Sequence, residues 1–181
     1  NLVDITDTSA KLEGTLLHKD IKNVDRFEIE GDSLYYIYTG TITKELRRAT
    51  ISDPSNYVAL VSKSTAPTEF VIDGDDIYYY SFPYSAFTAG DKNKVIGLYK
   101  VNKNATETDG ATKVKLLQSY APDVTVGDKK NEGKNFYCSA ISVKNGKVYF
   151  LNSFYYAGTS VGGDDHTYSF DTASNTLTRL D

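Results

Sequence analysis

Apolar and polar positions recur along this chain in the pattern of short β-strands. The segment 27–40, FEIEGDSLYYIYTG, is repeated as FVIDGDDIYYYSFP from Phe70 and, more loosely, as ISVKNGKVYFLNSF from Ile141. In each copy an alternating stretch leads into a turn with Gly or Asn, and an apolar run follows, LYYI, IYYY or VYFL. Alternation bounded by such turn residues is typical of β-hairpins. The pattern therefore predicts a repeat protein with three copies.

Each copy opens a unit of four predicted strands, and the strands are separated by clusters of Gly, Pro, Asn and Asp. We expect units at 25–63, 67–121 and 135–181, preceded by a half unit of two strands at 1–20. The one segment with helical character, KELRRA, lies in 43–51. That stretch alternates well enough for a strand, and its place in the repeat favours one. Asn145-Gly146 predicts a type I′ turn.

The spacing and the two-sided apolar strands together predict the architecture. Phe27 and Phe70 lie 43 residues apart, and four strands in a repeat of this length are typical of β-propeller blades. A strand of a β-sandwich has one buried face, so apolar and polar residues alternate along it. The segments LYYIY and IYYY are instead apolar on both faces. Apolar and polar residues alternate again in FEIE, which predicts a strand with one face partly exposed to solvent. We predict an all-β chain, a single β-propeller arc over 1–181 with about three and a half four-stranded blades. A β-sandwich is the alternative.

The second unit carries a recognisable motif. It reads Ile77-Tyr78-Tyr79-Tyr80, then LYKV at 98–101, then KLL at 115–117. This order resembles the YWTD-like propellers of the low-density-lipoprotein-receptor type, and more closely the bacterial propeller domains of unknown function that are similar to them. The chain departs from that pattern because it has no Trp and no Thr-Asp after the aromatic pair, and because insertions stretch one unit. The resemblance implies a binding or scaffold propeller, often extracellular or at the cell surface, and no catalytic residue.

A propeller arc of this size has open ends. Related rings usually close with about six to eight blades, so the arc leaves blade faces and a strand edge without a neighbour. We expect the ring to be completed by further sequence, by a partner chain or by self-association.

Charge and hydropathy exclude two classes of partner. The formal net charge is −4, the pI is about 5.2, and the 20 basic residues are dispersed, so a nucleic-acid surface is not expected. No apolar run approaches the roughly 18 residues of a membrane span. Richness in Lys, Asn and Tyr without Trp favours a bacterial origin.

Motifs for catalysis or metal binding are missing from the sequence. Cys138, the single cysteine, excludes an internal disulfide or a cysteine-based zinc site, and its apolar strand predicts burial. Asp164, Asp165 and His166 follow two glycines, and neighbours on a strand alternate faces, so a solvated turn is expected. The aspartates at 73–76 suit a tight turn, and a calcium site is left open. There is no G-x-S-x-G, no H-E-x-x-H and no phosphate loop. We predict a non-enzymatic protein with no catalytic residue, metal or cofactor.

Long insertions at 81–94, 119–134 and 152–165 all map to one face of the predicted propeller, and such insertions usually mark a binding face. The candidate ligand-binding residues are Tyr84, Phe87, Tyr120, Tyr155 and Tyr156. Their rings could instead pin their own loops onto the blades. The sequence favours a recognition module for a protein or glycan. The alternatives are a fragment of a glycan-processing hydrolase or lyase propeller, and a structural assembly element.

Overall fold

A computed structural model describes the backbone and side chains of residues 22–41, 43–61, 66–81, 97–106, 139–151 and 166–181. For residues 2–4, 15–18, 114–118, 124–126, 129–131, 133–138, 152–156 and 165 it gives the strand assignment and pairing alone.

Three antiparallel sheets of four strands make up most of the chain. The first sheet contains β3 (Val24–Glu30), β4 (Ser33–Thr39), β5 (Lys44–Thr50) and β6 (Val58–Val61). The second sheet contains β7 (Pro67–Asp73), β8 (Asp76–Ser81), β9 (Gly97–Asn102) and β10 (Val114–Gln118). The third sheet contains β13 (Gly133–Lys144), β14 (Lys147–Tyr156), β15 (Asp165–Asp171) and β16 (Thr176–Arg179). The all-β class is confirmed, and β5 confirms the strand expected within 43–51.

Two further strand pairs complete the described secondary structure. β1 (Leu2–Asp4) pairs with β2 (Thr15–His18), and β11 (Val124–Val126) pairs with β12 (Lys129–Asn131). The residues that the structure describes form no helix, and so none long and apolar enough to cross a membrane.

Two-residue turns join the first and second strands of each four-stranded sheet. Gly31 and Gly74 take φ values of 56° and 60° at the first turn position, where a left-handed backbone favours glycine. Asn145 and Gly146 have φ values of 53° and 71°. Positive φ at both central positions is the mark of a type I′ turn, which confirms the prediction from Asn-Gly. Because the turn fixes the register, each hairpin places the same repeat positions on the same face.

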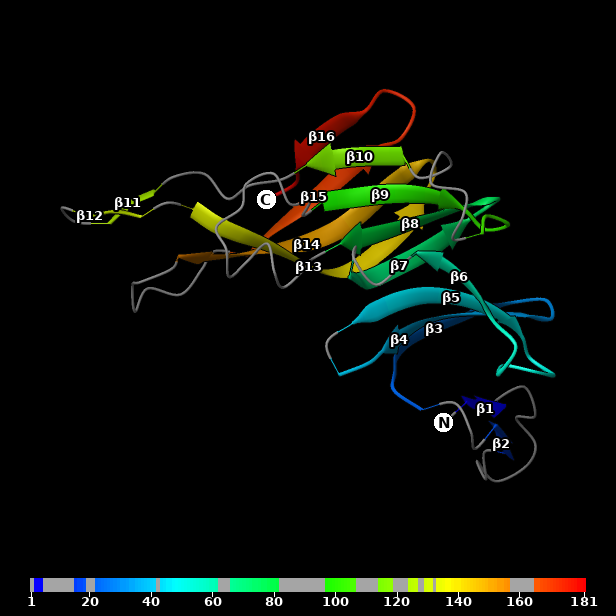
Figure 1. Cartoon of the computed structure of the whole chain (residues 1–181). Coiled ribbons are helices and arrows are strands. Elements are labelled where there is room, and N and C mark those ends of the chain that lie inside the picture. The colour runs from blue at the N-terminus through cyan, green and yellow to red at the C-terminus, as the bar shows by residue number, and fades with distance from the viewer. Residues whose placement is uncertain are drawn as a thin grey trace.

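The three sheets stack face to face in chain order (Figure 1). The core between the first and second sheets contains Tyr35, Ile37, Leu46, Leu60, Val61, Phe70, Ile77, Tyr79, Tyr99, Val101 and Ala105. The core between the second and third sheets contains Tyr78, Tyr80, Leu98, Ile141, Val148, Phe150 and Phe170. Tyr79 and Tyr80 therefore point to opposite neighbours, which explains why the strand is apolar on both faces.

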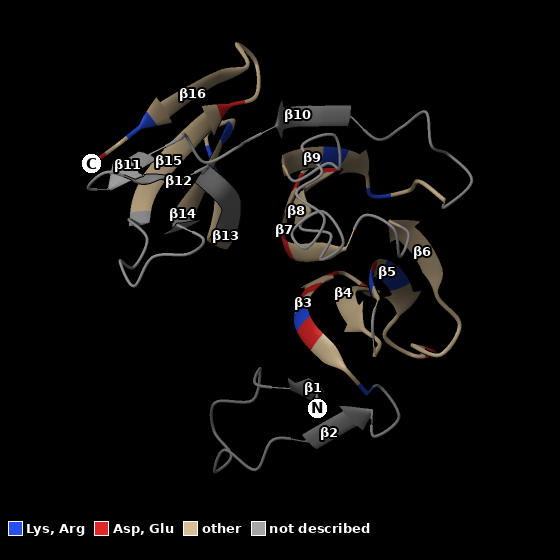
Figure 2. Ribbon diagram, turned by 60° about the vertical axis from the view of Figure 1, so that its left-hand side comes forward, with Lys and Arg blue, Asp and Glu red and all other residues tan. Residues whose placement is uncertain are grey.

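The first strands of the three sheets lie close together. β7 contacts both β3 and β13, whereas the fourth strands β6 and β16 lie far from one another, toward the outside of the stack (Figure 2).

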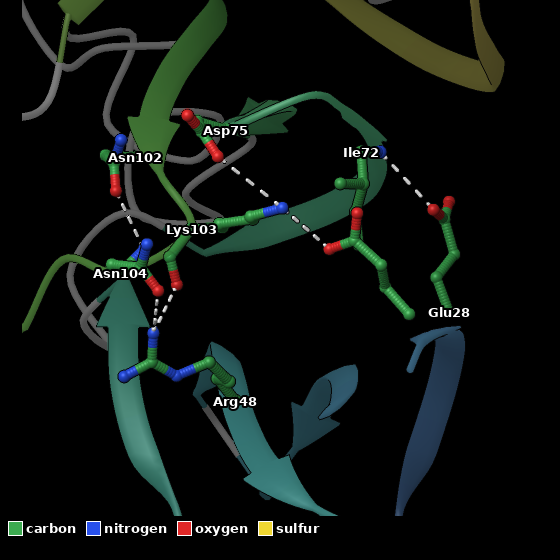
Figure 3. A network of polar contacts seen from close by, with 8 residues as sticks. Glu28, Arg48, Ile72, Asp75, Asn102, Lys103 and Asn104 are labelled. Carbon is green, nitrogen blue, oxygen red and sulfur yellow. Dashed lines mark hydrogen bonds and ion pairs between the residues drawn. The ribbon is translucent and has the colours of Figure 1, made fainter. Parts of the chain in front are cut away.

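Polar side chains join the first and second sheets near the end of β9 (Figure 3). Lys103 Nζ lies 2.9 Å from Glu30 Oε2 and 3.6 Å from Asp75 Oδ1. Arg48 Nη1 donates to the backbone oxygen of Lys103 at 2.7 Å and to Asn104 Oδ1 at 3.0 Å. The Lys103–Glu30 ion pair and the two hydrogen bonds of Arg48 join residues of separate units, so they help to fix the orientation of the two sheets.

The polar side of β3 also faces the second sheet. Arg26 Nη1 donates to Glu69 Oε2 at 2.7 Å, and Glu28 Oε2 accepts a hydrogen bond from the backbone N–H of Ile72 at 3.3 Å. The opposite side of β3 carries Phe27, which is 47% exposed. The partly wet face expected for this strand is therefore its apolar face, because the charged face has partners in β7.

An exposed carboxylate makes stability depend on pH. The backbone N–H groups of Ser174 and Ala173 donate to Asp171 Oδ1 at 2.9 and 3.1 Å and hold the pKa of Asp171 below its ordinary value of 3.8. The unfolded carboxyl then binds its proton at a higher pH than the folded one, so the free energy of unfolding should fall as the pH drops below about 4. Urea unfolding between about pH 5 and pH 2.5 measures this slope, and Asp171→Asn should reduce it. An NMR titration that gives Asp171 a pKa of 3.8 or higher would contradict the assignment.

Candidate functional site

The five aromatic residues selected from the sequence lie outside the residues whose side chains the structure describes. Tyr84, Phe87 and Tyr120 fall in undescribed segments, and Tyr155 and Tyr156 are placed only by their backbone in β14. Their role in ligand binding stays a prediction. The same holds for the burial of Cys138, which is described only as part of β13.

The strands that lead into the long insertions do end on one side of the stack. In the second sheet Ser81 pairs with Gly97, and Gly97 pairs with Gln118, so β8 and β10 end at the same edge. β14 points in the same direction in Figure 1, toward the left. Antiparallel meanders produce this arrangement, because alternate connections emerge at alternate ends.

A pocket lies on the face of the first sheet that is turned away from the second sheet. It has a cavity volume of about 500 Å³, within the range of about 300–1,000 Å³ that is common for small-ligand sites. Its lining residues are Lys22, Asn23, Tyr36, Tyr38, Arg47, Ser52, Asp53, Pro54, Ser55 and Tyr57. β4 and β5 supply the floor, and the segment 52–57 between β5 and β6 supplies a wall.

Arg47 stands between two tyrosine rings in this pocket. Its guanidinium carbon lies 3.7 Å from the ring centre of Tyr38 and 3.7 Å from that of Tyr57. Arg47 Nε donates to Glu45 Oε2 at 2.7 Å, and both charged residues are buried. An Arg held over an aromatic face gains cation–π attraction, and the carboxylate neutralises its charge. The result is an ordered stack whose outer ring, Tyr57, is 41% exposed.

The wall of the pocket is held in place by three hydrogen bonds. The Tyr36 hydroxyl donates to the backbone oxygen of Pro54 at 3.4 Å, the Asp53 N–H donates to Thr50 Oγ1 at 3.2 Å, and the Ser55 hydroxyl donates to Asp53 Oδ1 at 2.6 Å. Burial raises the pKa of Tyr36 more than the nearby Arg47 lowers it. Tyr36 therefore remains a neutral hydroxyl at physiological pH, able to hold the wall in place.

The sequence contained one signal for this pocket. Strand register places Arg47 opposite Tyr36 in the first sheet, and Tyr99 opposite Tyr79 in the second. Arg47 therefore occupies the repeat position of an aromatic residue in the next unit. A buried cation at a position where the next unit has an aromatic ring needs nearby groups that stabilise its charge. In the structure these groups are the rings of Tyr38 and Tyr57 and the carboxylate of Glu45.

The chemistry available in the pocket is that of stacking and hydrogen bonding. Tyrosine rings offer flat apolar faces, and the rim offers hydroxyl, amide, ammonium and carboxylate groups from Ser52, Asn23, Lys22 and Asp53. In the part of the chain whose side chains are described, no group of three or more His, Cys, Asp and Glu is placed to hold a metal ion.

Comparison with known proteins does not place the chain in a family. No protein-family model matches it, and no curated protein sequence matches it.

Proposed function

We propose that this chain is a non-enzymatic recognition module that binds a protein or a glycan. The observation that carries this proposal is the pocket of about 500 Å³ that is lined by the Tyr38–Arg47–Tyr57 stack and rimmed by hydrogen-bonding groups. Because the neighbouring Arg47–Glu45 pair orders the stack before a ligand arrives, little conformational entropy is lost on binding. Sugar rings and peptide side chains both stack on such tyrosines.

The proposed scaffold is an arc of β-propeller blades of the YWTD-like type, extracellular or at the surface of a bacterial cell. Two features support it: four-stranded meanders stack in chain order, and their first strands meet while their fourth strands diverge. The repeat motif in 77–80 and 98–101 adds the resemblance on which the family assignment rests.

The insertion face is a second contact surface for the same ligand class. The three long connections leave from strand ends on one side of the stack. Tyr84, Phe87 and Tyr120 lie in the segments that follow β8 and β10, and Tyr155 and Tyr156 are the last residues of β14. Surface connections that gather on one side of a rigid repeat scaffold are common binding surfaces.

Glycan-array and protein-capture screens on the full chain test the function, and variants then locate the site. Tyr57→Ala should weaken capture at least tenfold, because it removes the exposed ring of the stack, whereas Tyr57→Phe, the matched control, keeps the ring and should retain capture. Both variants should melt within a few degrees of the parent, since Tyr57 is 41% exposed.

The double variant Tyr155→Ala/Tyr156→Ala locates binding on the insertion face. A tenfold loss in this variant with none in Tyr57→Ala would assign the ligand to the insertions instead of the pocket. Capture that no variant alters would contradict both sites. Hydrolytic or lyase turnover of a captured glycan would favour the glycan-processing alternative.

A further inference from the structure

The charged groups at the pocket balance one another. Among the described residues that line it, Lys22 and Arg47 are cationic and Asp53 is anionic. Glu45 adds a second carboxylate, because it lies two positions before Arg47 on β5 and so shares a face of the strand with it. Arg47 Nε and Nη2 both donate to Glu45 Oε2, at 2.7 and 2.5 Å. These four residues therefore give the pocket cations but no net positive charge.

The guanidinium of Arg47 is engaged within the chain. Burial raises the pKa of the Tyr36 hydroxyl, and a hydrogen bond from Arg47 opposes that rise. The rings of Tyr38 and Tyr57 both lie 3.7 Å from the guanidinium carbon, and Arg47 is only 9% exposed. Arginine binds a ligand carboxylate best when it presents its donors as a fork, but Arg47 turns Nε and Nη2 toward Glu45. An anionic ligand would lose water here without gaining a counter-charge.

The groups that remain for a ligand suit a neutral sugar. Tyr57 is 41% exposed although Arg47 lies against its ring, and an aromatic ring is a flat apolar surface. A pyranose ring has flat C–H faces that pack on such a surface. The rim adds the amide of Asn23 and the hydroxyls of Ser52 and Ser55. Amide and hydroxyl groups both donate and accept hydrogen bonds, as sugar hydroxyls do.

The floor of the pocket does not present a strand edge. It is formed by β4 and β5, the two inner strands of the first sheet, and each of them is paired on both sides. An extended peptide that binds by adding a strand needs the unpaired backbone groups of an edge strand. The pocket therefore recognises its ligand through side chains, which favours a sugar ring over a peptide backbone.

We propose that the pocket takes an uncharged pyranose residue of a glycan, and that Glu45 sets this preference by neutralising Arg47. The proposal rests on the recognition function proposed above and narrows its ligand class. Glu45 is thus a specificity-determining residue that acts through Arg47.

A glycan array that pairs neutral glycans with their uronate-containing and sialylated counterparts tests the preference on the full chain. Neutral glycans should be captured about tenfold more tightly than their acidic counterparts, because the acidic group meets no unneutralised cation. Tyr57→Ala should lose this capture. Saturation-transfer NMR on a captured neutral glycan should show the strongest transfer at the C–H groups on one face of one sugar ring.

Glu45→Gln tests the role of the carboxylate. It leaves the charge of Arg47 without its counter-charge, so the ratio of acidic to neutral capture should rise about tenfold, and the rise should shrink in about 0.5 M NaCl. Asp25→Asn is the matched control, because it makes the same change of charge at a residue that does not line the pocket. It should leave the ratio unchanged. A melting curve checks that Glu45→Gln is folded at the assay temperature, and the ratio of the parent decides if it is not.

The outcomes separate this proposal from the recognition function. Equal or tighter capture of acidic glycans by the parent overturns the neutral-sugar proposal, and so does a folded Glu45→Gln variant with an unchanged ratio. Neutral-glycan capture that Tyr57→Ala leaves intact overturns the pocket as its site. A peptide or protein that the parent captures and Tyr57→Ala loses overturns the sugar but keeps the recognition function. A chain that captures neither glycans nor proteins overturns both.

Discussion

Replacing Phe70 with Ala is expected to lower the free energy of unfolding by about 3–5 kcal/mol. Phe70 is fully buried between the first and second sheets, in the cluster that includes Tyr35 and Ile37. Removing the ring loses its transfer free energy and leaves a cavity, because the two closely packed sheets cannot shift far enough to close the gap. Urea unfolding followed by circular dichroism measures the effect as a lower midpoint at constant slope.

Phe27→Ala is the matched control for Phe70→Ala, since the same residue type stands at the same repeat position. Phe27 is 47% exposed, so its replacement should cost no more than about 1 kcal/mol. An equally large loss for both variants would mean that Phe27 is covered in solution. A small loss for both would contradict the packing of the first sheet against the second.

Local patterns were sufficient to predict the strands of the three four-stranded sheets and their two-residue turns, but not β11 and β12, which lie in a segment that was expected to be an insertion. Alternation, β-branched and aromatic residues and the Gly-Asp and Asn-Gly turns act over a few residues, and the structure confirms what they indicate. The two-sided apolar run at 77–80 also predicted that the second sheet would have a neighbour on each face, as its two clusters show. The sheets that the structure describes do not close into a ring, so the propeller stays a prediction.

The face that each strand turns to its neighbour could not be predicted in the same way. In FEIE the alternation shows that Phe27 and Ile29 share one face and that Glu28 and Glu30 share the other. Hydrophobicity alone would bury the first pair. The structure gives the carboxylates their contacts with the second sheet instead, because the order of the sheets decides which face has a neighbour.

The pocket was missed because its parts come from separate elements. Tyr38 is on β4, Arg47 is on β5, and Tyr57 follows the turn after β5. Tyr38 and Tyr57 each have an ordinary place in a strand or loop, and the unusual repeat position of Arg47 does not by itself show which groups surround it. Only the pairing of β4 with β5 and the fold of 52–57 over the sheet bring the two rings to the cation.

Replacing Glu45 with Gln is expected to lower the free energy of unfolding by about 3 kcal/mol. Glu45 and Arg47 are 5% and 9% exposed, and Arg47 Nε donates to Glu45 Oε2 at 2.7 Å. Gln keeps the size and an acceptor oxygen of Glu, but it leaves the guanidinium charge buried without a counter-charge. An unpaired buried charge strongly destabilises the folded state. The cation–π contacts with Tyr38 and Tyr57 offset only part of this cost. Urea unfolding at neutral pH measures the loss.

Asp25→Asn provides the comparison with an ion pair on the surface. Asp25 pairs with Lys44, the neighbour of Glu45 on β5, and the two side chains are 44% and 31% exposed. Burial opposes ionisation of Asp25, but hydrogen bonds from Lys44 and Thr39 outweigh it and lower its pKa. Screening by water should limit the cost of Asp25→Asn to about 1 kcal/mol or less.

If Glu45→Gln cost no more than Asp25→Asn, the charge of Arg47 would be solvated and the pocket floor would not be rigid. A clearly larger loss of unfolding free energy for Glu45→Gln would instead show that Arg47 is buried away from water and neutralised by Glu45. The stack under Tyr57 would then be preorganised for binding.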